Sequence, residues 1–321
     1  MNKKIIQVKD LENYKALKIL VTGGSGQVGS ELRALKNNHN LNFFFPSSKD
    51  FNLLNFPSIE NYLNSNDFDL IINLAAYTDV ESSESDNEKP NLINNLAVQK
   101  ISQEAKQRNI GLIHLSSDYV FGDSLYSPFN AYDEKKPINY YGLTKSLGED
   151  HVLSEYNKGI IIRLSSVFSI YGNNFIKKIL KKLITEPSVK VIADQKISLT
   201  YAADFSDNIS SIINLYNKLD FENDDRIFHF TCEGYTNWYS VSEVVYDEAN
   251  NMKNNFLTSR LIPITSKDWI SKAKRSKDSR LKVDYSFFKN NNIILSPWEK
   301  SVRCVVNKVL PTIISEIENE K

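Results

Sequence analysis

Short apolar runs alternate with amphipathic segments through the first half of the chain. The apolar runs cover residues 17–21, 42–45, 69–76, 110–117 and 159–168. Between them, residues 28–36, 57–65, 95–108 and 141–156 repeat apolar positions at helical spacing. Short runs that are apolar on both faces, separated by helices, are typical of parallel strands covered on both sides. The pattern predicts an α/β fold with a doubly wound parallel sheet.

After residue 168 the pattern becomes less regular. It predicts helices over 175–184 and 204–216 and from Pro297 onward, with strands over 189–193 and 226–230. We interpret residues 1–168 as one domain and residues 169–321 as a smaller C-terminal α/β domain that binds the substrate. Segments near 200–235 are expected to return to the first domain. Residues 1–16 form an extension ahead of the first strand.

The composition narrows the classes of partner. The 321 residues include 39 Lys plus Arg and 39 Asp plus Glu, so the formal net charge is zero and the chain lacks the basic footprint of a nucleic-acid-binding protein. No apolar run approaches the ~20 residues of a membrane span, and the N-terminal stretch is too short for a signal peptide. We therefore expect a cytoplasmic protein with no nucleic-acid or membrane partner. Two cysteines and four histidines without metal-ligand spacing predict no metal site.

A glycine-rich turn follows the first apolar run. Residues 22–29 read TGGSGQVG, which spaces Gly23, Gly26 and Gly29 as GxxGxxG. Such glycines permit a tight strand-to-helix turn, let the backbone approach a pyrophosphate and allow the helix to pack closely on the strand. The free N–H groups and the positive dipole end of the following helix also favour phosphate. The turn predicts that residues 1–168 form a Rossmann-like, NAD(P)-binding domain.

The second apolar run bears on the choice of cofactor. A classical NAD site places an acid at the end of this strand, where it binds the 2′-hydroxyl of the adenosine ribose. Here the run ends in FPSSK, and the first acid is Asp50. Ser47, Ser48 and Lys49 offer hydroxyl and ammonium groups to a 2′-phosphate. We therefore expect NADPH, with NADH as the alternative.

Candidate catalytic residues end the fourth apolar run and begin the helical segment after it. Tyr141 and Lys145 are four residues apart on a predicted helix and so share one face. A phenol with its ordinary pKa of about 10 is a weak acid at neutral pH, and an adjacent ammonium favours the phenolate. Ser117 ends the fourth run, where its hydroxyl can polarise a substrate carbonyl. We interpret these three as a catalytic set, and His114, which alternates within a buried strand, as a core residue.

With these motifs in this order, the chain resembles the extended short-chain dehydrogenase/reductase superfamily, and within it the dTDP-4-dehydrorhamnose reductase family. The likeness runs from about residue 17 to 307. It rests on the stretches GGSGQVGSEL, KDFNLLN, NLAAYTDVESSE, HLSSDYVFG, YYGLTKSLGE, YGNNFIKKIL, YTNWYSVSEVVYDEA and SRLKVDYSFFKNNNIILSPWEKSV. The resemblance implies a Rossmann-like domain, a substrate domain and NAD(P)H-dependent reduction of a nucleotide-linked keto sugar.

The resemblance also implies roles for residues that match the family's motifs. It places cofactor contacts at Gly26, Gln27, Val28, Asp50, Phe51, Ala75, Ala76 and Thr78, in addition to Tyr141 and Lys145. It implies substrate contacts at Asp118 and, in the GNNF stretch, at Asn174. Arg280 in the SRL stretch is expected near the nucleotide diphosphate, because a guanidinium suits paired phosphate oxygens.

Departures from the family pattern bear on the sugar. Ser166 stands where the family often has a tryptophan in contact with the sugar, and it is expected to line an altered sugar pocket. Ser83 replaces an alanine of the VDxAE motif, and residues 197–200 and 274–280 lack the family's prolines. These changes leave the identity of the sugar open.

The residues after Ser117 separate the reactions of this superfamily. Dehydratases carry Asp-Glu there, whereas this chain has Asp118 and Tyr119 and so lacks the glutamate that assists water elimination. We hypothesise that the C4 ketone of a nucleotide-linked 4-keto-6-deoxyhexose is reduced, with Ser117 polarising the carbonyl and Tyr141 donating the proton. The alternatives are a nucleotide-sugar epimerase and a non-catalytic subunit similar to the methionine adenosyltransferase beta subunit. Some relatives are dimers, so a homodimer is an option that the sequence leaves open.

Overall fold

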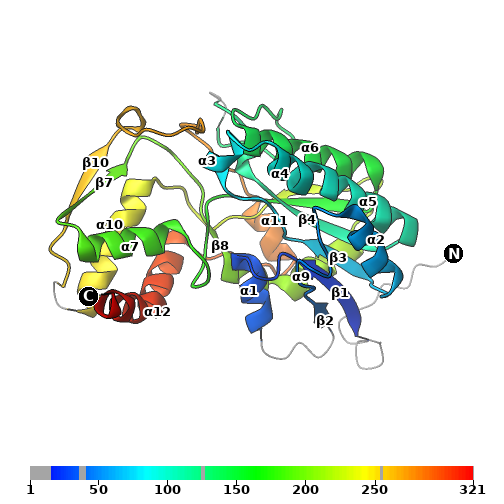
Figure 1. Ribbon diagram of the computed structural model, residues 1–321, viewed down its shortest axis with the longest axis horizontal. Coiled ribbons are helices and arrows are strands. Elements are labelled where there is room, and N and C mark those ends of the chain that lie inside the picture. Colours follow the sequence, from blue (N-terminus) through cyan, green and yellow to red (C-terminus); the bar gives the residue numbers. More distant parts are fainter. Residues whose placement is uncertain (1–15, 36–40, 124–126, 254–255, 321) are drawn as a thin grey trace.

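Two lobes lie side by side in the computed structural model, which describes residues 16–35, 41–123, 127–253 and 256–320. Figure 1 shows a sheet with helices on both of its faces in one lobe, and the helices α7, α10 and α12 in the other. Of the extension at residues 1–16, all but the last residue lies outside the described residues.

Parallel strands form the central sheet of the larger lobe, in the order β2-β1-β3-β4-β5-β9. They are β1 (Leu17–Thr22), β2 (Leu41–Phe44), β3 (Leu70–Asn73), β4 (Gly111–Ser117), β5 (Gly159–Leu164) and β9 (Ile227–His229). This topology confirms the predicted doubly wound α/β fold. Because β2 and β3 lie on opposite sides of β1, the chain reverses direction across the sheet there. The carboxyl ends of the strands at such a reversal form the usual ligand crevice of the fold.

Helices cover both faces of this sheet. On one face lie α2 (Phe56–Asn64), α5 (Ala97–Arg108) and α6 (Tyr140–Glu155), whose apolar residues share a core with β3 and β4. On the other lie α1 (Gln27–Ala34), α8 (Ala202–Asp207), α9 (Ile209–Lys218) and α11 (Tyr285–Asn290). The short elements are α3 (Val80–Ser83), α4 (Glu88–Asn91), the π-helix η2 (Leu92–Leu96) and the 3-10 helices η3 (Asp118–Val120) and η4 (Ser266–Asp268). Strands β3, β4, β5 and β9 are thus buried on both faces, as the continuous apolar runs indicated, whereas the edge strand β2 is partly exposed.

A second core holds the smaller lobe together. It is built from α7 (Phe175–Thr185), α10 (Trp238–Met252), α12 (Trp298–Asn319) and a parallel pair, β7 (Ser188–Ile192) and β10 (Arg260–Ile264). On α7 the residues Ile176, Ile179, Leu180 and Leu183 are buried and repeat at helical spacing. The lysines between them remain on the outer side of the helix, toward solvent or toward the space between the lobes.

Parts of the second half of the chain return to the sheet. Strand β9 is its last strand, and α8 and α9 pack against it. Helix α11 also packs against the sheet, and the sequence pattern did not indicate this return. The single strand expected over 159–168 is divided, because Ser166 has φ +44° and a left-handed residue cannot continue a strand. The piece beyond it, β6 (Val167–Phe168), pairs with β8 (Thr200–Tyr201) in a sheet of its own.

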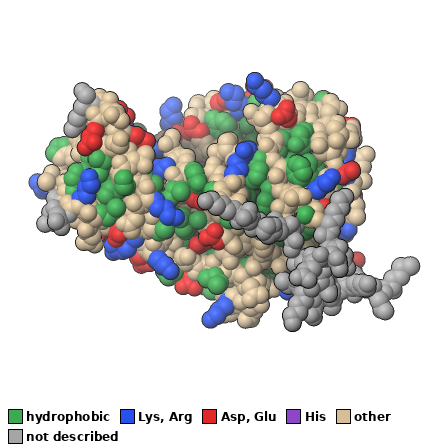
Figure 2. All heavy atoms as spheres, turned by 90° about the horizontal axis from the view of Figure 1, so that it is seen from below, with side chains coloured by type: hydrophobic (Ala, Val, Ile, Leu, Met, Phe, Trp, Pro, Cys, Tyr) green, Lys and Arg blue, Asp and Glu red, His purple; other side chains and the backbone are tan. Residues whose placement is uncertain are grey.

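Within the described ranges, no helix is long and apolar enough to cross a membrane. On the face of the molecule shown in Figure 2, basic and acidic side chains are interspersed.

Candidate functional site

The glycine-rich turn lies at the carboxyl end of β1, against the loop that follows β3. Gly23 has φ +67°, and a Cβ on it would lie 2.7 Å from the backbone nitrogen of Ala75. A Cβ on Gly29 would overlap the carbonyl oxygen of Gly23, so α1 packs onto the turn only without a side chain there. Gly26 precedes the first residue of α1, and its nitrogen donates to Gly23. The turn therefore exposes backbone N–H groups at a helix N-terminus, where phosphate binds.

A cavity of about 1140 Å³ extends from this turn to α6. Most of the predicted cofactor and catalytic residues line it: Gly23, Gly26, Gln27, Val28, Ser47, Ser48, Phe51, Ala75, Ala76, Thr78, Ser117, Tyr141 and Lys145. Lys49 and Asp50, which the sequence also indicated, are not among its lining residues. Asp50 instead accepts a hydrogen bond of 2.6 Å from Ser47.

A cation that the sequence reasoning missed lines this cavity beside the end of β2. Arg33, on the last turn of α1, lines the cavity with Ser47 and Ser48. Its guanidinium carbon lies 4.6 Å from the centre of the Phe45 ring, and its Nη2 donates to the Phe45 carbonyl oxygen at 3.4 Å. These contacts hold the guanidinium at the end of β2. Arg33 lies on α1, four residues beyond Gly29, and no sequence motif marks it.

The candidate catalytic residues lie at the opposite end of the same cavity. Asn139 caps α6 by accepting from the Gly142 nitrogen at 2.8 Å, and this cap precedes Tyr141 and Lys145 on the first two turns. Burial raises the pKa of Tyr141, and its hydrogen bond with Ser117 partly opposes that shift. The sequence predicted that Lys145 would lower this pKa, but burial outweighs any such effect because desolvation disfavours the phenolate.

Lys145 is itself almost fully buried. Its Nζ donates to the Leu115 carbonyl oxygen at 2.7 Å and lies 3.4 Å from Nε2 of His114. Burial lowers the pKa of Lys145 to about 8, and the Glu149 carboxylate one turn along α6 opposes that shift. An amine with a pKa this close to neutrality can both hold and release a proton at working pH.

Asp118 lies beside this set, at the start of η3. Its carboxylate accepts from Ser117 Oγ and from Ser165 Oγ, each at 2.9 Å. Burial raises its pKa, although the hydrogen bonds from Ser165 and Ser117 work in the opposite direction. Tyr119, which replaces the dehydratase glutamate, packs edge-on against Tyr141 with ring centres 5.3 Å apart.

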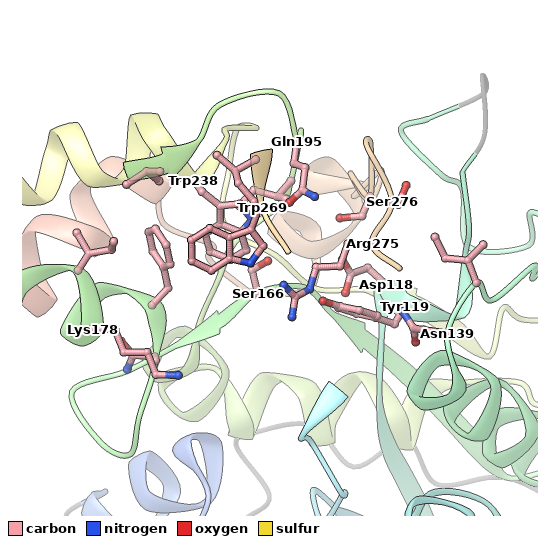
Figure 3. A pocket seen from close by; sticks show the side chains of 18 of the residues that line it. Asp118, Tyr119, Asn139, Ser166, Lys178, Gln195, Trp238, Trp269, Arg275 and Ser276 are labelled. Atoms are coloured by element: carbon pink, nitrogen blue, oxygen red, sulfur yellow. The ribbon is translucent and has the colours of Figure 1, made fainter. Parts of the chain in front are cut away.

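A second cavity, of about 410 Å³, lies between the lobes and meets the first. Asp118, Tyr119 and Ser166 line both cavities. Figure 3 shows the indole of Trp269 near Ser166, with Arg275 reaching toward Tyr119. The other polar, charged and aromatic residues of its lining include Asn139, Asn174, Phe175, Lys178, Lys182, Lys190, Gln195, Trp238, Ser276 and Ser279. Ligands bound in the two cavities would therefore meet at Asp118, Tyr119 and Ser166, beside Ser117 and Tyr141 of the larger cavity.

Two arginines of the same segment have different surroundings. Arg280, expected near the diphosphate, is not among the lining residues of either cavity. Its guanidinium binds both carboxylate oxygens of Asp278, at 2.8 and 2.7 Å, and lies 5.1 Å from the centre of the Tyr235 ring. Arg275 lines the second cavity and donates to Glu81 of α3 at 2.8 Å.

Comparison with known proteins agrees with this geometry. The family described as RmlD substrate binding domain matches residues 17–310. The chain belongs to this family. It is 32% identical over 300 residues to a dTDP-4-dehydrorhamnose reductase of Escherichia coli K12, which covers 92% of this chain and 99% of that protein. It is 28% identical to the spore coat polysaccharide biosynthesis protein SpsK of Bacillus subtilis, over 80% of this chain and 86% of SpsK.

Solved structures agree with the RmlD assignment. A dTDP-4-dehydrorhamnose reductase from Clostridium acetobutylicum superposes with a TM-score of 0.82 and 26% identity, over 92% of this chain and all of that one. One from Yersinia enterocolitica has a TM-score of 0.80 and 26% identity, over 91% of this chain and 99% of that one. The resemblance inferred from the sequence motifs is thereby confirmed.

The sequence reasoning missed several residues of the RmlD domain that line the second cavity. Lys178 and Lys182 are four residues apart on α7, so a search for basic stripes on predicted helices would have found them. Trp269 and Arg275 lie in an irregular segment, and no periodicity marks them. Among the described residues, no cluster of three or more His, Cys, Asp or Glu side chains could hold a metal ion.

Proposed function

We propose that this protein uses NADPH to reduce the C4 ketone of a nucleotide-linked 4-keto-6-deoxyhexose, and that the substrate is dTDP-4-dehydro-L-rhamnose, reduced to dTDP-L-rhamnose. The observation that carries the proposal is the junction of the two cavities at Asp118, Tyr119 and Ser166, beside Ser117 and Tyr141. Relatives named dTDP-4-dehydrorhamnose reductase, matched over nearly their whole length, support the choice of sugar.

The residues at the junction divide the work of the reduction. NADPH, when bound, supplies a hydride to the carbonyl carbon. Tyr141, which burial keeps protonated, donates its proton to the carbonyl oxygen, so the ketone becomes an alcohol and Tyr141 a phenolate. The Ser117 hydroxyl, which donates to Asp118 in this structure, would turn to donate to the same oxygen and so polarise the carbonyl. Lys145 stabilises the phenolate and returns a proton to it.

The lining of the larger cavity fits a dinucleotide with a 2′-phosphate. The cradle at Gly23 and Gly26 fits the pyrophosphate, because a side chain at Gly23 would collide with Ala75. Arg33, Ser47 and Ser48 would hold the 2′-phosphate through charge-assisted hydrogen bonds. Removing the guanidinium by Arg33→Ala should raise KM for NADPH about tenfold or more and leave KM for NADH unchanged. Equal changes in both KM values would contradict this assignment.

The lining of the smaller cavity fits a nucleoside diphosphate. Trp238 and Trp269 present flat apolar faces on which a base can stack. Lys178, Lys182 and Lys190 supply positive charge for two phosphates. The sugar would then lie toward Asp118 and Ser166, where the small serine side chain leaves room for it.

The two domains bind different ligands. Residues 1–168 bind the cofactor and residues 169–321 the substrate, with the segment near 200–235 belonging to the first domain. We place the enzyme in the cytoplasm as a homodimer. Sedimentation of the purified protein, with and without NADPH, tests the oligomeric state, and a monomeric mass in both would contradict it.

The decisive experiment follows NADPH oxidation by purified protein with dTDP-4-dehydro-L-rhamnose generated in situ. Fast oxidation that yields dTDP-L-rhamnose is expected, and it should fall at least about a hundredfold in Tyr141→Phe, because proton donation contributes roughly 10²–10⁴ to such reactions. Tyr140→Phe, one residue off the Lys145 face, is the matched control and should keep wild-type turnover. NADPH binding without oxidation of any 4-keto sugar would refute the reductase and favour an epimerase or a regulatory subunit.

A further inference from the structure

A line of polar side chains crosses three neighbouring strands of the sheet and ends at Lys145. The strand register pairs Thr22 of β1 with Asn73 of β3, and Asn73 with His114 of β4. All three side chains are buried, and they lie in the core beneath the cofactor cavity. The line begins at the backbone nitrogen of Ala75, which belongs to the loop that lines that cavity.

The hydrogen bonds of this line can be given directions, starting from Ala75. A backbone N–H only donates, so Thr22 Oγ1 accepts from it at 3.2 Å. The Thr22 hydroxyl then donates to Asn73 Oδ1 at 2.6 Å. The oxygen of Asn73 is thereby engaged, and its amide nitrogen donates to Nδ1 of His114 at 3.0 Å.

These directions settle which nitrogen of His114 carries the proton. Burial and the neighbouring Lys145 hold the pKa of His114 well below its ordinary value, so the ring is neutral and carries a single N–H. Because Nδ1 accepts, the proton is on Nε2, which faces Nζ of Lys145 at 3.4 Å. An ammonium has three donors and no acceptor, whereas a neutral amine offers a lone pair. The arrangement therefore suits the neutral amine of Lys145.

Protonation of Lys145 requires the whole line to reverse. The ammonium must donate to a bare Nε2, which moves the ring proton to Nδ1. Nδ1–H then needs the oxygen of Asn73, so the amide turns over and its nitrogen donates to Thr22. Thr22 Oγ1 would accept from both Asn73 and Ala75, and its own hydroxyl proton would lose its acceptor on Asn73. Leaving a buried donor unpaired is unfavourable, so the line favours release of the proton from Lys145.

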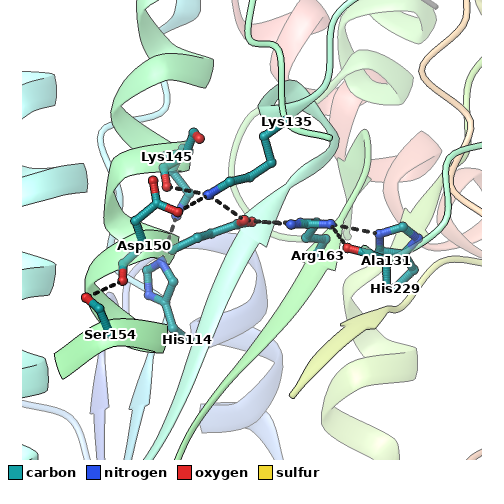
Figure 4. A network of polar contacts seen from close by, with 10 residues as sticks. His114, Ala131, Lys135, Lys145, Asp150, Ser154, Arg163 and His229 are labelled. Carbon is teal, nitrogen blue, oxygen red and sulfur yellow. Dashed lines mark hydrogen bonds and ion pairs between the residues drawn. The ribbon is translucent and has the colours of Figure 1, made fainter. Parts of the chain in front are cut away.

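We propose that His114 is a positioning residue whose tautomer is coupled to the charge of Lys145, through a reversible hydrogen-bond line anchored by Asn73, Thr22 and the Ala75 amide. The line opposes Glu149, which faces Lys145 from the next turn of α6 and favours the ammonium. Glu149 is itself paired with Arg163 of β5 and with Lys135. Figure 4 shows His114 and Lys145 next to this ionic cluster.

The coupling gives Lys145 a defined task in the proposed reduction, and this part of the inference rests on the proposed function. After Tyr141 has donated its proton, Lys145 must supply the next one. A line that stabilises the neutral amine makes that transfer easier. The line starts at Ala75, in the loop that lines the larger cavity.

The test reads the tautomer of His114 directly and needs no activity. Two-bond ¹H–¹⁵N correlation spectra of ¹⁵N-histidine-labelled protein, without added cofactor, are recorded from pH 6.5 to 9.5, and His114→Gln assigns the signals. We expect a neutral ring throughout, with Nε2–H at high pH and Nδ1–H at low pH, and a midpoint near the Lys145 pKa of about 8. His229 is the internal control, because its Nδ1 meets the Lys282 carbonyl at 3.0 Å and it should keep Nδ1–H throughout. A His114 tautomer that stays the same across this range would overturn the proposal.

A variant links the line to catalysis. The aspartate in Asn73→Asp has the shape of asparagine, but its carboxylate can only accept a hydrogen bond from Nδ1–H of His114. The variant should therefore hold His114 in its Nδ1–H tautomer and favour the ammonium of Lys145. Because the reduction needs Lys145 in its protonated form, the alkaline limb of the kcat/KM profile should move to higher pH by about one unit. If Asn73→Asp does not fold, Thr22→Val removes the anchor and should move the limb in the same direction. A uniform loss of rate at every pH, with the limb in place, would mean that the line is merely structural. Loss of all reductase activity in the wild type would refute the proposed function and leave the tautomer test intact.

Discussion

Replacing Glu149 by glutamine should destabilise the fold, because this carboxylate neutralises a buried guanidinium. Arg163 donates to Glu149 through Nε at 2.8 Å and through Nη2 at 2.7 Å. The two side chains are 1% and 0% exposed, so water cannot replace either partner. Arg163 also donates to the Ala131 carbonyl at 2.6 Å (Figure 4), so a change of its position would break that bond as well.

The expected magnitude follows from the burial. Glutamine keeps the size and one acceptor oxygen but not the charge, and removing one partner of a buried ion pair costs about 3–5 kcal/mol. At ~2.1 cal/mol/K per residue, 321 residues have an unfolding entropy of about 0.7 kcal/mol/K, so Tm should fall by roughly 4–7 °C.

Glu149→Gln also removes the negative charge that raises the pKa of Lys145. The neutral amine is then favoured, and the alkaline limit of reductase activity should move to lower pH.

Thermal unfolding followed by circular dichroism, together with urea titration, measures this loss. Asp150→Asn is the matched control: it binds Lys135 from a side chain that is 58% exposed, and such surface pairs contribute about 0–1 kcal/mol. The double variant Glu149→Gln/Arg163→Met should lose less than the sum of the two single variants, because it removes the unpaired charge. A Tm within about 1 °C of the wild type for Glu149→Gln, or additive single losses, would refute the reasoning.

Three further predictions follow from particular contacts. Gly23→Ala should weaken NADPH binding at least about tenfold in a fluorescence titration, because φ +67° and the nearby Ala75 backbone exclude a Cβ; wild-type affinity would contradict this. Trp269→Ala should raise KM for the nucleotide sugar about tenfold and leave KM for NADPH unchanged, since stacking contributes roughly 1–3 kcal/mol. Its neighbour Ile270 is fully exposed, and Ile270→Ala should have no effect. Leu180→Ala should cost about 2–5 kcal/mol in urea unfolding, whereas Lys181→Ala, which loses only an exposed ion pair with Glu320, should cost at most about 1 kcal/mol.

Features with a local cause could be read from the sequence. The parallel sheet follows from apolar runs whose length matches strands and whose two faces are both apolar. The turn at Gly23, Gly26 and Gly29 needs only the glycines and their position between strand and helix. Tyr141 and Lys145 share a helix face because four residues make about one turn. In each case the residues that set the geometry lie within a few positions of one another, so periodicity and spacing carry the information.

The residues that complete the cavities could be identified only from the tertiary structure. Arg33 is held at the end of β2 by its contacts with Phe45. Arg275 rather than Arg280 lines the smaller cavity, and Arg280 is paired with Asp278 instead. The line from Thr22 through Asn73 to His114 exists only once β1, β3 and β4 are in register. Sequence separations of 51 and 41 residues divide these partners. Contacts of this kind are set by chain packing and strand register, and no local pattern of hydrophobic and polar residues contains that information.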